Sequence, residues 1–283
     1  MAKSKTLYVS DLDGTLLNHN AILSEYTKSG LNKLISRGIN FTVASGRTID
    51  AAKEIMADIE LNIPIISFNG AIIYDVKQKS PIKVYWLTAE AVKNIVAVLK
   101  SHNVSALIYE FKDDALRSYY ESLEQKPLYD YVADRKARYN SIFRQVNDFG
   151  EISSEQIMYF TLLDTYDRVK PVYDGLKKIP DINMSMVNNT YSKDLWFLEI
   201  FNAGASKENA VRFLRETYGY RKVIGFGDNH NDLPMFKVCD LSVAVKNAND
   251  EVKAAADCIC ESYDEDGVVK WIEDHECFRD LAG

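Results

Sequence analysis

Two carboxylates lie close together near the start of the chain, at Asp11 and Asp13, directly after a short apolar run. Gly14 and Thr15 follow them and permit a tight turn, so both acids can face one site. Paired carboxylates repel each other unless a cation or a shared proton lies between them. A hard divalent ion removes that repulsion, and oxygen ligands of this kind suit Mg²⁺. The segment therefore predicts a reactive, cation-binding acid pair, against the alternative of a solvated acidic turn.

A second acidic segment, residues 225–232, also follows an apolar run. It carries Asp228 and Asp232, with Asn231 beside the second acid. Asp228 is placed to complete a metal site that Asp11 begins. The alternative is an ordinary polar turn in which Asp232 caps the next helix. The glycines of this segment do not make a dinucleotide-binding fingerprint, which needs a third glycine at a fixed spacing.

Two predicted helix starts supply groups that can hold an anion. Ser45, Gly46 and Arg47 lead from an apolar run into a helix, where a hydroxyl and backbone N–H groups can bind phosphate. An ordinary helix cap is the alternative, and Arg47 either reaches the phosphate or pairs with a surface acid. Lys207 stands in the first turn of another helix, where the helix dipole prefers an anion. A lysine at this end of a helix is explained if its amine faces a bound phosphate. The alternative is a lysine on the solvated surface.

The elements that must position these groups alternate between strand and helix. Short apolar runs predict strands at residues 7–10, 41–44, 65–68, 196–200, 223–226 and 241–245, and helical spacing predicts helices at 24–37, 49–59, 207–218 and 233–238. These strands are apolar throughout, as in parallel sheets that helices cover on both faces. Ligands bind at the carboxyl ends of such strands. The pattern predicts an α/β fold with a doubly wound parallel sheet.

The middle of the chain has a different character. Its elements are longer and more polar, with helices predicted at 88–100 and 166–178 and strands at 105–111, 156–163 and 183–187. A hairpin is predicted around residues 77–81. The polar motifs described above do not occur in this stretch. We therefore expect a discontinuous core of residues 1–81 and 189–283, with residues 82–188 as an inserted α+β domain.

Composition limits the partners of the chain. It has 283 residues, a formal net charge of −7 and a sequence pI of about 5.3, whereas binding to nucleic acids or anionic membranes needs excess positive charge. No apolar stretch approaches a signal sequence or the roughly 20 residues that span a bilayer. The four cysteines lie near the end of the chain without a CxxC spacing, which favours structural thiols in a reducing cytoplasm. The expected partner is a small molecule, with no nucleic acid and no membrane; no oligomeric state follows from the sequence.

Taken together, the four motifs resemble those of the haloacid dehalogenase superfamily of phosphotransferases. The large insert between Ser45 and Lys207 and the form of residues 227–232 are similar to the Cof-type phosphatases with a subtype IIB cap, as are residues 69–71 after the third strand. The resemblance covers essentially the whole chain, closely at the motifs and loosely in the insert. It implies the Rossmann-like core of that superfamily, an inserted cap that sets substrate specificity, and Mg²⁺ as cofactor.

The resemblance also implies the chemistry of the acids. Asp11 would attack phosphorus and form a phospho-aspartate. Asp13 would protonate the leaving alcohol and then deprotonate the water that hydrolyses the intermediate. Mg²⁺ would be held by Asp11, by the backbone carbonyl of Asp13 and by Asp228, and would offset the repulsion between carboxylate and phosphate. Thr15 would shape the loop that follows.

The remaining motif residues are implied to bind phosphate or to support those that do. Ser45, with Gly46 in the same loop, and Lys207 would bind the phosphate oxygens, where charge must be stabilised. Asn231 would support the phosphate end of the site. Asp232 would act indirectly, by holding Lys207 or a metal-bound water.

The expected function is a Mg²⁺-dependent phosphomonoester hydrolase that acts on a small metabolite, such as a sugar phosphate. A phosphosugar mutase and a non-catalytic sugar-phosphate-binding module are the alternatives; Asp at both positions 11 and 13 favours catalysis. A calcium-binding loop is excluded, because the segment from Asp11 lacks the further ligands of an EF-hand. In the insert, Arg135 and Arg138, near Tyr129 and Tyr131, are candidate substrate contacts, against the alternative of a solvated helix face.

Overall fold

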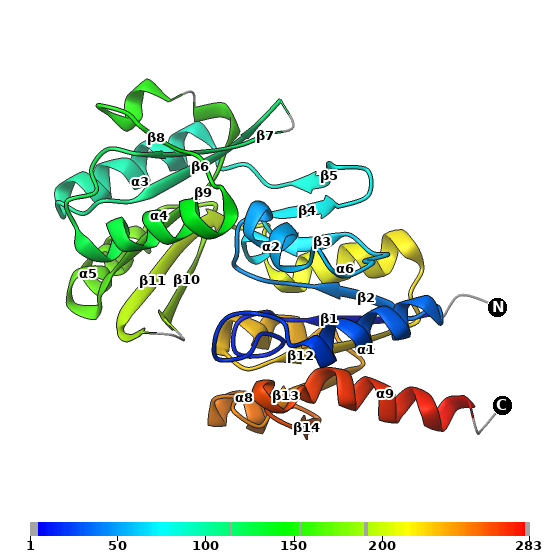
Figure 1. The fold of residues 1–283 in the computed structure, drawn as a ribbon. Coiled ribbons are helices and arrows are strands. Elements are labelled where there is room, and N and C mark those ends of the chain that lie inside the picture. Colours follow the sequence, from blue (N-terminus) through cyan, green and yellow to red (C-terminus); the bar gives the residue numbers. More distant parts are fainter. Residues whose placement is uncertain (1–4, 114, 153, 190–191, 281–283) are drawn as a thin grey trace. The chain divides into compact units, whose positions relative to one another are not determined.

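The structure is a computed structural model that describes residues 5–113, 115–152, 154–189 and 192–280 (Figure 1). The chain divides into two compact units. The first, here called the core unit, consists of residues 1–47, 52–79 and 206–283. The second, here called the insert unit, consists of residues 48–51 and 80–205. Each unit has its own central sheet.

The core unit is built on a five-stranded parallel sheet. Its strands are β1 (Thr6–Ser10), β2 (Asn40–Val43), β12 (Lys222–Gly227), β13 (Leu241–Val245) and β14 (Cys258–Cys260), in the spatial order β14-β13-β12-β1-β2. Because all five strands run the same way, their carboxyl ends meet at one edge of the sheet. The chain order reverses direction across β1, and such a switch point is where open α/β sheets bind ligands.

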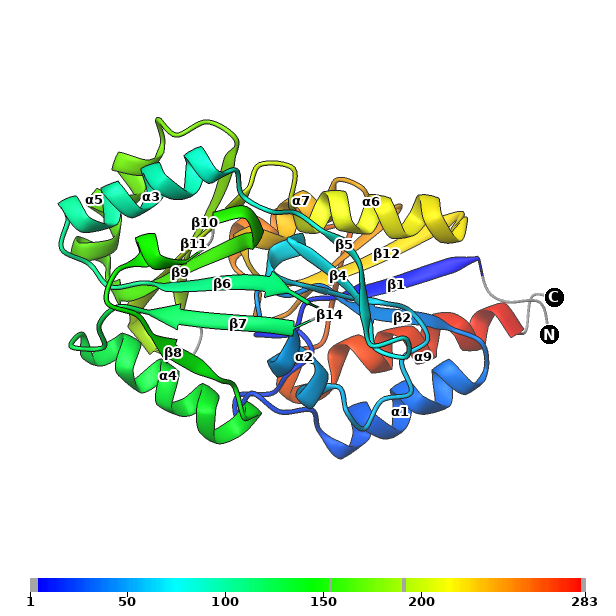
Figure 2. The same ribbon diagram turned by 90° about the horizontal axis from the view of Figure 1, so that it is seen from above.

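Helices cover both faces of this sheet (Figure 2). One face carries α1 (Glu25–Ser36) and α9 (Gly267–Asp280), and the other carries α6 (Lys207–Tyr218) and α7 (Leu233–Phe236). The short helix α8 (Asp250–Ala255) follows β13. Every residue of β1 and β2 is buried, as expected of strands that are covered on both sides. The predicted doubly wound α/β core is confirmed.

Local signals set the ends of these helices. The side chain of Ser24 accepts a hydrogen bond from the N–H of Thr27 and so caps α1, as predicted. Ser206 caps α6 in the same way through the N–H of Asn209. The left-handed residue Gly219 ends α6, since a glycine adopts that conformation without a steric penalty. The cap at Ser206 fixes where α6 begins and therefore where Lys207 stands.

A second, antiparallel pair of strands completes the core unit. It is formed by β3 (Ile65–Ser67) and β4 (Ile72–Asp75), and Ile66 of β3 makes a single parallel bridge with Ala44, just beyond β2. The helix α2 (Ile49–Ile55) ends before residue 59, earlier than predicted, and the chain then turns towards β3.

The insert unit is built on a six-stranded sheet. Its strands are β6 (Leu107–Lys112), β7 (Ala115–Tyr120), β8 (Phe143–Gln145), β9 (Ile157–Thr165), β10 (Ile182–Asn189) and β11 (Ser192–Asn202), in the order β10-β11-β9-β6-β7-β8. The pairing is antiparallel except between β7 and β8. The unit also contains β5 (Ser80–Val84) and the helices α3 (Ala89–Ser101), α4 (Lys126–Tyr139) and α5 (Tyr166–Leu176). The helices α3 and α5 share a hydrophobic core with one face of the sheet, and α4 packs on the other face (Figure 2).

The second boundary between the units is not where the sequence predicted it. The insert unit ends at residue 205, whereas the expected end was residue 188. The strand predicted at 196–200 belongs to β11, which pairs with β9 and β10 inside the insert unit. Its apolar run suggested a core strand, but helices cover both faces of this sheet too, so β11 carries buried apolar residues on both sides. Leu198 faces the shared core with α3 and α5, while Phe197 contacts Tyr131 of α4. The sequence did not predict β7, α4 or β8, which are polar and short of periodic apolar residues.

Within the described ranges, no helix combines the length and the apolar character needed to cross a membrane.

Candidate active site

The polar groups of the core unit gather at the carboxyl edge of its parallel sheet. Asp11 directly follows β1, Ser45 follows β2, and Asp228 follows β12. The loops are tied together through the backbone. The N–H of Asp11 donates to the carbonyl of Phe226 at 3.0 Å, and the N–H of Ala44 donates to the carbonyl of Ser10 at 2.9 Å. Three strands therefore deliver their end residues to one place.

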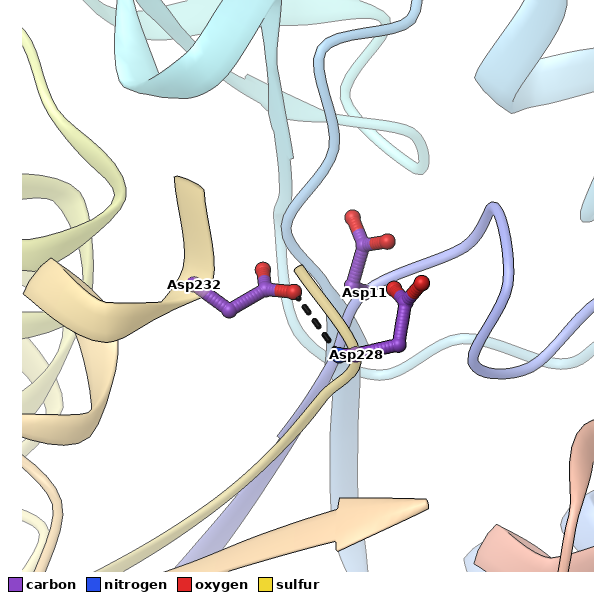
Figure 3. A group of neighbouring side chains, drawn as sticks. All are labelled: Asp11, Asp228 and Asp232. Carbon is purple, nitrogen blue, oxygen red and sulfur yellow. Dashed lines mark hydrogen bonds between the residues drawn. The ribbon is translucent and has the colours of Figure 1, made fainter. Parts of the chain in front are cut away.

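Three carboxylates form a buried cluster there (Figure 3). Asp11, Asp228 and Asp232 each offer an oxygen, and these oxygens lie within 4.8 Å of one another. All three residues are less than a tenth exposed, and Asp232 is fully buried. Three carboxylates that are this close together and buried from solvent repel one another strongly when charged, unless cations compensate their charge.

The cation that the chain itself supplies is Lys207, at the start of α6. Its Nζ donates to Oδ1 of Asp11 at 2.5 Å and to Oδ1 of Asp232 at 2.7 Å. The side chain is 1% exposed, so it is not the solvated surface lysine of the alternative interpretation. Its position at a helix start, where the dipole is unfavourable for a cation, is compensated by these two carboxylates.

The electrostatics follow from burial and proximity. Burial raises the pKa of Asp11 to about 7, with Lys207 opposing that shift and the neighbouring acids adding to it. Burial, together with Asp232 and Asp11, also raises the pKa of Asp228 well above its usual range. Burial alone would lower the pKa of Lys207, but Asp11 and Asp232 outweigh it and the net shift is upward. The lysine stays charged, while the carboxylates gain from any further cation.

Asp232 accepts more hydrogen bonds than either of the other two acids of the cluster. Besides accepting from Lys207, its Oδ2 accepts from the backbone N–H of Asp228 at 3.0 Å (dashed in Figure 3) and of Asn229 at 3.1 Å. It lies in a short 3-10 turn (His230–Asp232) after β12. With three donors on its two oxygens, Asp232 fixes both the amine of Lys207 and the loop that carries Asp228.

Asp228 is held from the other side by the loop after β1. The hydroxyl of Thr15 donates to Asp228 Oδ1 at 3.0 Å. Gly14 adopts a φ of +81°, and a Cβ at this position would lie 2.3 Å from Asp228 Oδ2. Only glycine lets the backbone pass this close to the carboxylate. The loop at Gly14 and Thr15 therefore packs directly around the carboxylate of Asp228.

Asp13 points towards Arg47 and does not join the carboxylate cluster. Arg47 donates from Nε to Asp13 Oδ2 at 2.7 Å and from Nη2 to Asp13 Oδ1 at 2.6 Å. This two-pronged ion pair fixes the direction of the Asp13 carboxylate. The side chain of Asp13 is 26% exposed and that of Arg47 is 7% exposed. Of the two interpretations left open for Arg47, the structure shows pairing with an acid, and that acid is Asp13.

Ser45 occupies the end of β2 beside Asp11. It is buried, and its Oγ accepts a hydrogen bond from the N–H of Arg47 at 3.1 Å, across Gly46. The following loop is braced by residues 69–71, since the N–H of Asn69 donates to the carbonyl of Ser45 at 2.9 Å. Gly70, with a φ of +95°, lies so close to α6 that a Cβ would be 2.2 Å from the carbonyl oxygen of Ser206. This close approach brings the Ser45 loop next to the start of α6.

Several predicted residues lie outside the carboxylate cluster. Asn231 is in the turn between Asp228 and Asp232 and is partly exposed; no hydrogen bond joins its side chain to the cluster in the described part of the chain. In the insert unit, Arg135 lies over the ring of Tyr131, and Arg138 pairs with a neighbouring acid of α4, Asp134. Tyr129 is exposed on the same helix.

Two further residues, which the sequence did not predict, lie at the edge of the site. Asn247 and Asn249 follow β13, and each bonds a loop that carries an acid. Asn247 Nδ2 donates to the carbonyl of Gly14 at 2.7 Å, and the N–H of Asn249 donates to the carbonyl of Asp228 at 3.0 Å. The signal that could have found them is the one used for the other motifs, a polar residue directly after an apolar strand.

The cluster fits a divalent cation. Asp11 uses one carboxylate oxygen for Lys207 and Asp228 uses one for Thr15, and within the described residues no hydrogen bond reaches the second oxygen of either. The two remaining oxygens belong to neighbouring buried carboxylates, and the pKa values of both carboxylates are raised. Hard oxygen ligands and uncompensated charge suit Mg²⁺ or a similar ion. Asp232, already holding three donors, is the least suited of the three.

Comparison with known proteins identifies the family of the chain. A family model described as haloacid dehalogenase-like hydrolase matches residues 8–272. The chain is 26% identical over 273 residues to a Bacillus subtilis protein named 5-amino-6-(5-phospho-D-ribitylamino)uracil phosphatase YitU, covering 95% of this chain and 97% of the relative.

Solved structures agree in fold. A haloacid dehalogenase-like hydrolase from Bacteroides thetaiotaomicron superposes with a TM-score of 0.80 at 28% identity, covering 95% of this chain and 98% of the other. A subclass IIB sugar phosphatase of the same superfamily, BT4131, superposes with a TM-score of 0.77 at 21% identity, covering 96% and 99%. The second likeness shows that the chain shares the fold of that subclass.

Proposed function

The chain belongs to the haloacid dehalogenase-like hydrolase family and is a phosphatase, and from that premise we propose that it hydrolyses the phosphate monoester of a small, hydroxyl-rich metabolite. Asp11 is the nucleophile, Asp13 the acid and base, and Mg²⁺ the cofactor. One observation carries the proposal. The carboxylate of Asp11 stands at the end of β1, oriented by the buried Lys207 and beside a second carboxylate, Asp228.

Asp11 suits the part of nucleophile because its carboxylate is fixed and incompletely compensated. Lys207 orients this carboxylate through Oδ1, and one of its two oxygens is the attacking oxygen. In the first step, a bond forms between this oxygen and phosphorus while the bond from phosphorus to the ester oxygen breaks. In the second step, water attacks phosphorus, the bond to Asp11 breaks, and inorganic phosphate and the free carboxylate result.

Asp13 suits the part of general acid and base because it is in the same turn and partly exposed. In its protonated form it gives its proton to the leaving alkoxide, so that a neutral alcohol departs; the carboxylate that results, which Arg47 can pair with, then accepts a proton from the attacking water. The bidentate pairing with Arg47 sets the direction of this carboxylate. Arg47 therefore acts as a positioning residue for the proton transfers.

Phosphate would be bound by the groups around Asp11. Lys207 is the only ammonium held directly against Asp11 among the described residues, and it would stabilise the charge that builds on the phosphoryl oxygens. The Ser45 hydroxyl and the N–H of Gly46, at the end of the adjacent strand, would contribute further donors. Asn231, in the turn after β12, is proposed to support the same end of the site.

The metal would be held by Asp11, by the backbone carbonyl of Asp13 and by Asp228. When bound, Mg²⁺ would offset the repulsion between the carboxylates and the incoming phosphate and orient the phosphoryl group. The chain's own contribution is to keep the two carboxylates adjacent. Thr15 does so by holding Oδ1 of Asp228, and Asp232 does so by holding the backbone on which Asp228 stands.

The substrate class rests on the relatives. YitU is named as a phosphatase of a ribitylamino-uracil phosphate, and BT4131 as a sugar phosphatase. Both names describe a phosphate on a small hydroxyl-rich molecule. We extend that class to this chain and assign substrate selection to the inserted domain. Three of the cysteines, Cys239, Cys258 and Cys260, are free thiols, which supports a reducing cytoplasm as the place of action.

The test is phosphate release from a panel of sugar, polyol and nucleotide phosphates and p-nitrophenyl phosphate, with Mg²⁺ and with EDTA. The proposal predicts release that requires the metal and is fastest with the sugar and polyol esters. Folded, Mg²⁺-supplied protein that moves phosphate between positions of one sugar without releasing it would be a mutase. Binding of the esters without either reaction would make the chain a binding module.

A further inference from the structure

Asn247 joins the segment after β13 to the loop that carries the first acidic motif. Its Nδ2 donates to the carbonyl of Gly14 at 2.7 Å, and its Oδ1 accepts from the backbone N–H of Tyr263 at 3.0 Å. Both polar groups of the amide are therefore used, each by a backbone group of a different loop. The residue belongs to none of the motifs that supply nucleophile, proton donor or phosphate ligands.

The carbonyl that Asn247 holds is in the peptide group that links Gly14 to Thr15. A peptide group is planar, so fixing the carbonyl of Gly14 also fixes the direction in which Thr15 leaves it. The hydroxyl of Thr15 in turn donates to Asp228 Oδ1. The backbone at Gly14 passes so close to Asp228 that a Cβ would be 2.3 Å from Oδ2. The orientation of this peptide group therefore bears directly on the position of the Asp228 carboxylate.

The same segment holds Asp228 by a second route. The N–H of Asn249 donates to the backbone carbonyl of Asp228 at 3.0 Å, and its Nδ2 donates to Asn229 Oδ1 at 3.0 Å. The segment from 247 to 249 thus bonds the loop after β1 through one asparagine and the loop after β12 through the other. These are the two loops whose carboxylates must stand at a fixed separation to share a cation.

We propose that Asn247 is a positioning residue for the divalent cation. It sets the separation of Asp11 and Asp228 through the Gly14–Thr15 peptide group, and so determines how tightly Mg²⁺ binds. The inference rests on the proposed function, in that it takes these two carboxylates as ligands. Groups that orient metal ligands from outside typically change metal affinity by about 10- to 100-fold when they are removed.

The alternative is a purely structural role, in which Asn247 only holds the segment from 247 to 249 against the backbone of Tyr263. The chain offers a matched control in Asn62, whose Nδ2 donates to the carbonyl of Ile39 at 2.9 Å. Ile39 directly precedes β2, so this bond is at the amino edge of the parallel sheet, opposite the site. Asn62→Ala also removes a partly buried bond from a side-chain amide to a backbone carbonyl in the core unit, but at a distance from the carboxylates.

The experiment measures Mg²⁺ binding by calorimetry in the full chain, beside the Mg²⁺ dependence of phosphate release. Asn247→Ala is expected to weaken Mg²⁺ binding roughly tenfold, while turnover at saturating Mg²⁺ falls much less. Asn62→Ala is expected to lower the unfolding temperature and leave Mg²⁺ binding unchanged. Asn247→Gln, which keeps both polar groups but displaces them, is expected to lose affinity in the same direction and serves if the alanine variant does not fold.

A double-mutant cycle adds a second readout. Thr15→Val removes the hydroxyl that holds Asp228 and keeps the shape of the side chain. Because both residues act through one peptide group, the combined loss of Mg²⁺ affinity in Asn247→Ala with Thr15→Val is expected to be smaller than the sum of the single losses.

The outcomes separate this inference from the proposed function. If wild-type protein binds Mg²⁺ and releases phosphate but Asn247→Ala and Asn247→Gln bind Mg²⁺ as tightly as Asn62→Ala does, the positioning role is overturned. Fully additive losses in the cycle would overturn the route through Gly14 and Thr15. Wild-type protein that neither binds Mg²⁺ nor releases phosphate would instead overturn the proposed function itself.

Discussion

The two sheets of this chain hold their charged residues in different ways. At the carboxyl edge of the parallel sheet, Asp11, Lys207, Asp228 and Asp232 are all less than a tenth exposed and lie within one cluster. In the insert unit, several ion pairs are instead on exposed helix faces, between residues four apart. Examples are Lys126 with Asp130 and Arg138 with Asp134. Two of its buried acids, Glu110 and Asp164, each pair with an arginine that reaches solvent.

We attribute the buried charges of the core unit to function and the exposed charges of the insert unit to solubility. Removing a carboxylate from water costs several kcal/mol, and a cluster with three acids and one lysine leaves part of that cost uncompensated. Pairs on exposed helix faces contribute about 0.3–0.5 kcal/mol each. A fold selected for stability alone would not collect buried acids at one edge of a sheet. We therefore propose that the core unit holds the reactive site, and the following changes test that contrast.

The largest effect is expected from Asp11→Asn. The amide keeps the shape of the carboxylate and can still accept a bond from Lys207, but it cannot attack phosphorus. Phosphate release is expected to fall by about 10⁴-fold or more. Because the change removes one of three mutually repelling acids, the unfolding temperature is expected to stay the same or rise. Near-normal turnover, with identity of the variant verified by mass spectrometry, would break the assignment.

Lys207→Met is expected to damage both activity and stability. It removes the cation that compensates Asp11 and Asp232 and leaves those carboxylates buried without it, which typically costs about 3–5 kcal/mol. Turnover should fall by about 10²- to 10³-fold, as for loss of one charge-stabilising donor. The measurement is unfolding by denaturant with and without Mg²⁺, beside steady-state kinetics. A variant as stable as wild type at neutral pH would contradict the picture of an undercompensated cluster.

Arg47→Lys tests whether the direction of Asp13 matters. Lysine keeps the positive charge but cannot form the two parallel bonds that hold the carboxylate. Turnover is expected to fall roughly tenfold with little change in Mg²⁺ affinity, since Asp13 offers its carboxylate to Arg47 and not to the cluster. An activity loss that is fully reversed by excess Mg²⁺ would show instead that Arg47 serves the metal.

Mg²⁺ binding should depend on pH through the buried acids. Burial raises the pKa of Asp11 to about 7 in the metal-free chain, and the carboxylate must lose its proton before it can hold a cation. Affinity is therefore expected to be highest above pH 8 and to fall roughly tenfold between pH 8 and pH 6. Calorimetry in two buffers of different ionisation enthalpy checks the proton release. Asp11→Asn should flatten the dependence, and an affinity that rises on acidification would contradict the assigned shift.

The smallest effect is expected in the insert unit, from Lys126→Ala. This lysine pairs with Asp130 on an exposed helix face, where the ion pair is screened by solvent. Unfolding temperature, turnover and Mg²⁺ affinity are all expected to remain at wild-type values. A loss as large as that of Lys207→Met would remove the contrast between the two regions.

Much of the core could be predicted because one physical rule governs it. Parallel strands covered on both faces are apolar throughout, so β1, β12 and β13 stand out in the sequence, and the polar residues after them must meet at one edge. That rule was enough to group Asp11 with Asp228. The N-cap of α1 at Ser24 followed from local chemistry in the same way.

The remainder depends on contacts between distant residues. The strand β11 carries buried apolar residues on both sides because α4 covers the second face of its sheet, and α4 itself has too few apolar positions to be found by periodicity. The partner of Arg47 could not be chosen by sequence, since several acids stand within reach of such a long side chain. Asn247 looks like an ordinary turn residue until the carbonyl of Gly14 is seen beside it.

The central claim, that Asp11 carries the phosphoryl group, is tested most directly by trapping the intermediate. Wild-type protein turning over a sugar or polyol phosphate with Mg²⁺ would be quenched in acid within milliseconds, digested and examined by mass spectrometry. The account predicts one phosphoryl group on the peptide that contains Asp11, present during turnover, absent with EDTA and absent in Asp11→Asn. Turnover with the phosphoryl group on any other residue, or rapid turnover by Asp11→Asn, would contradict it.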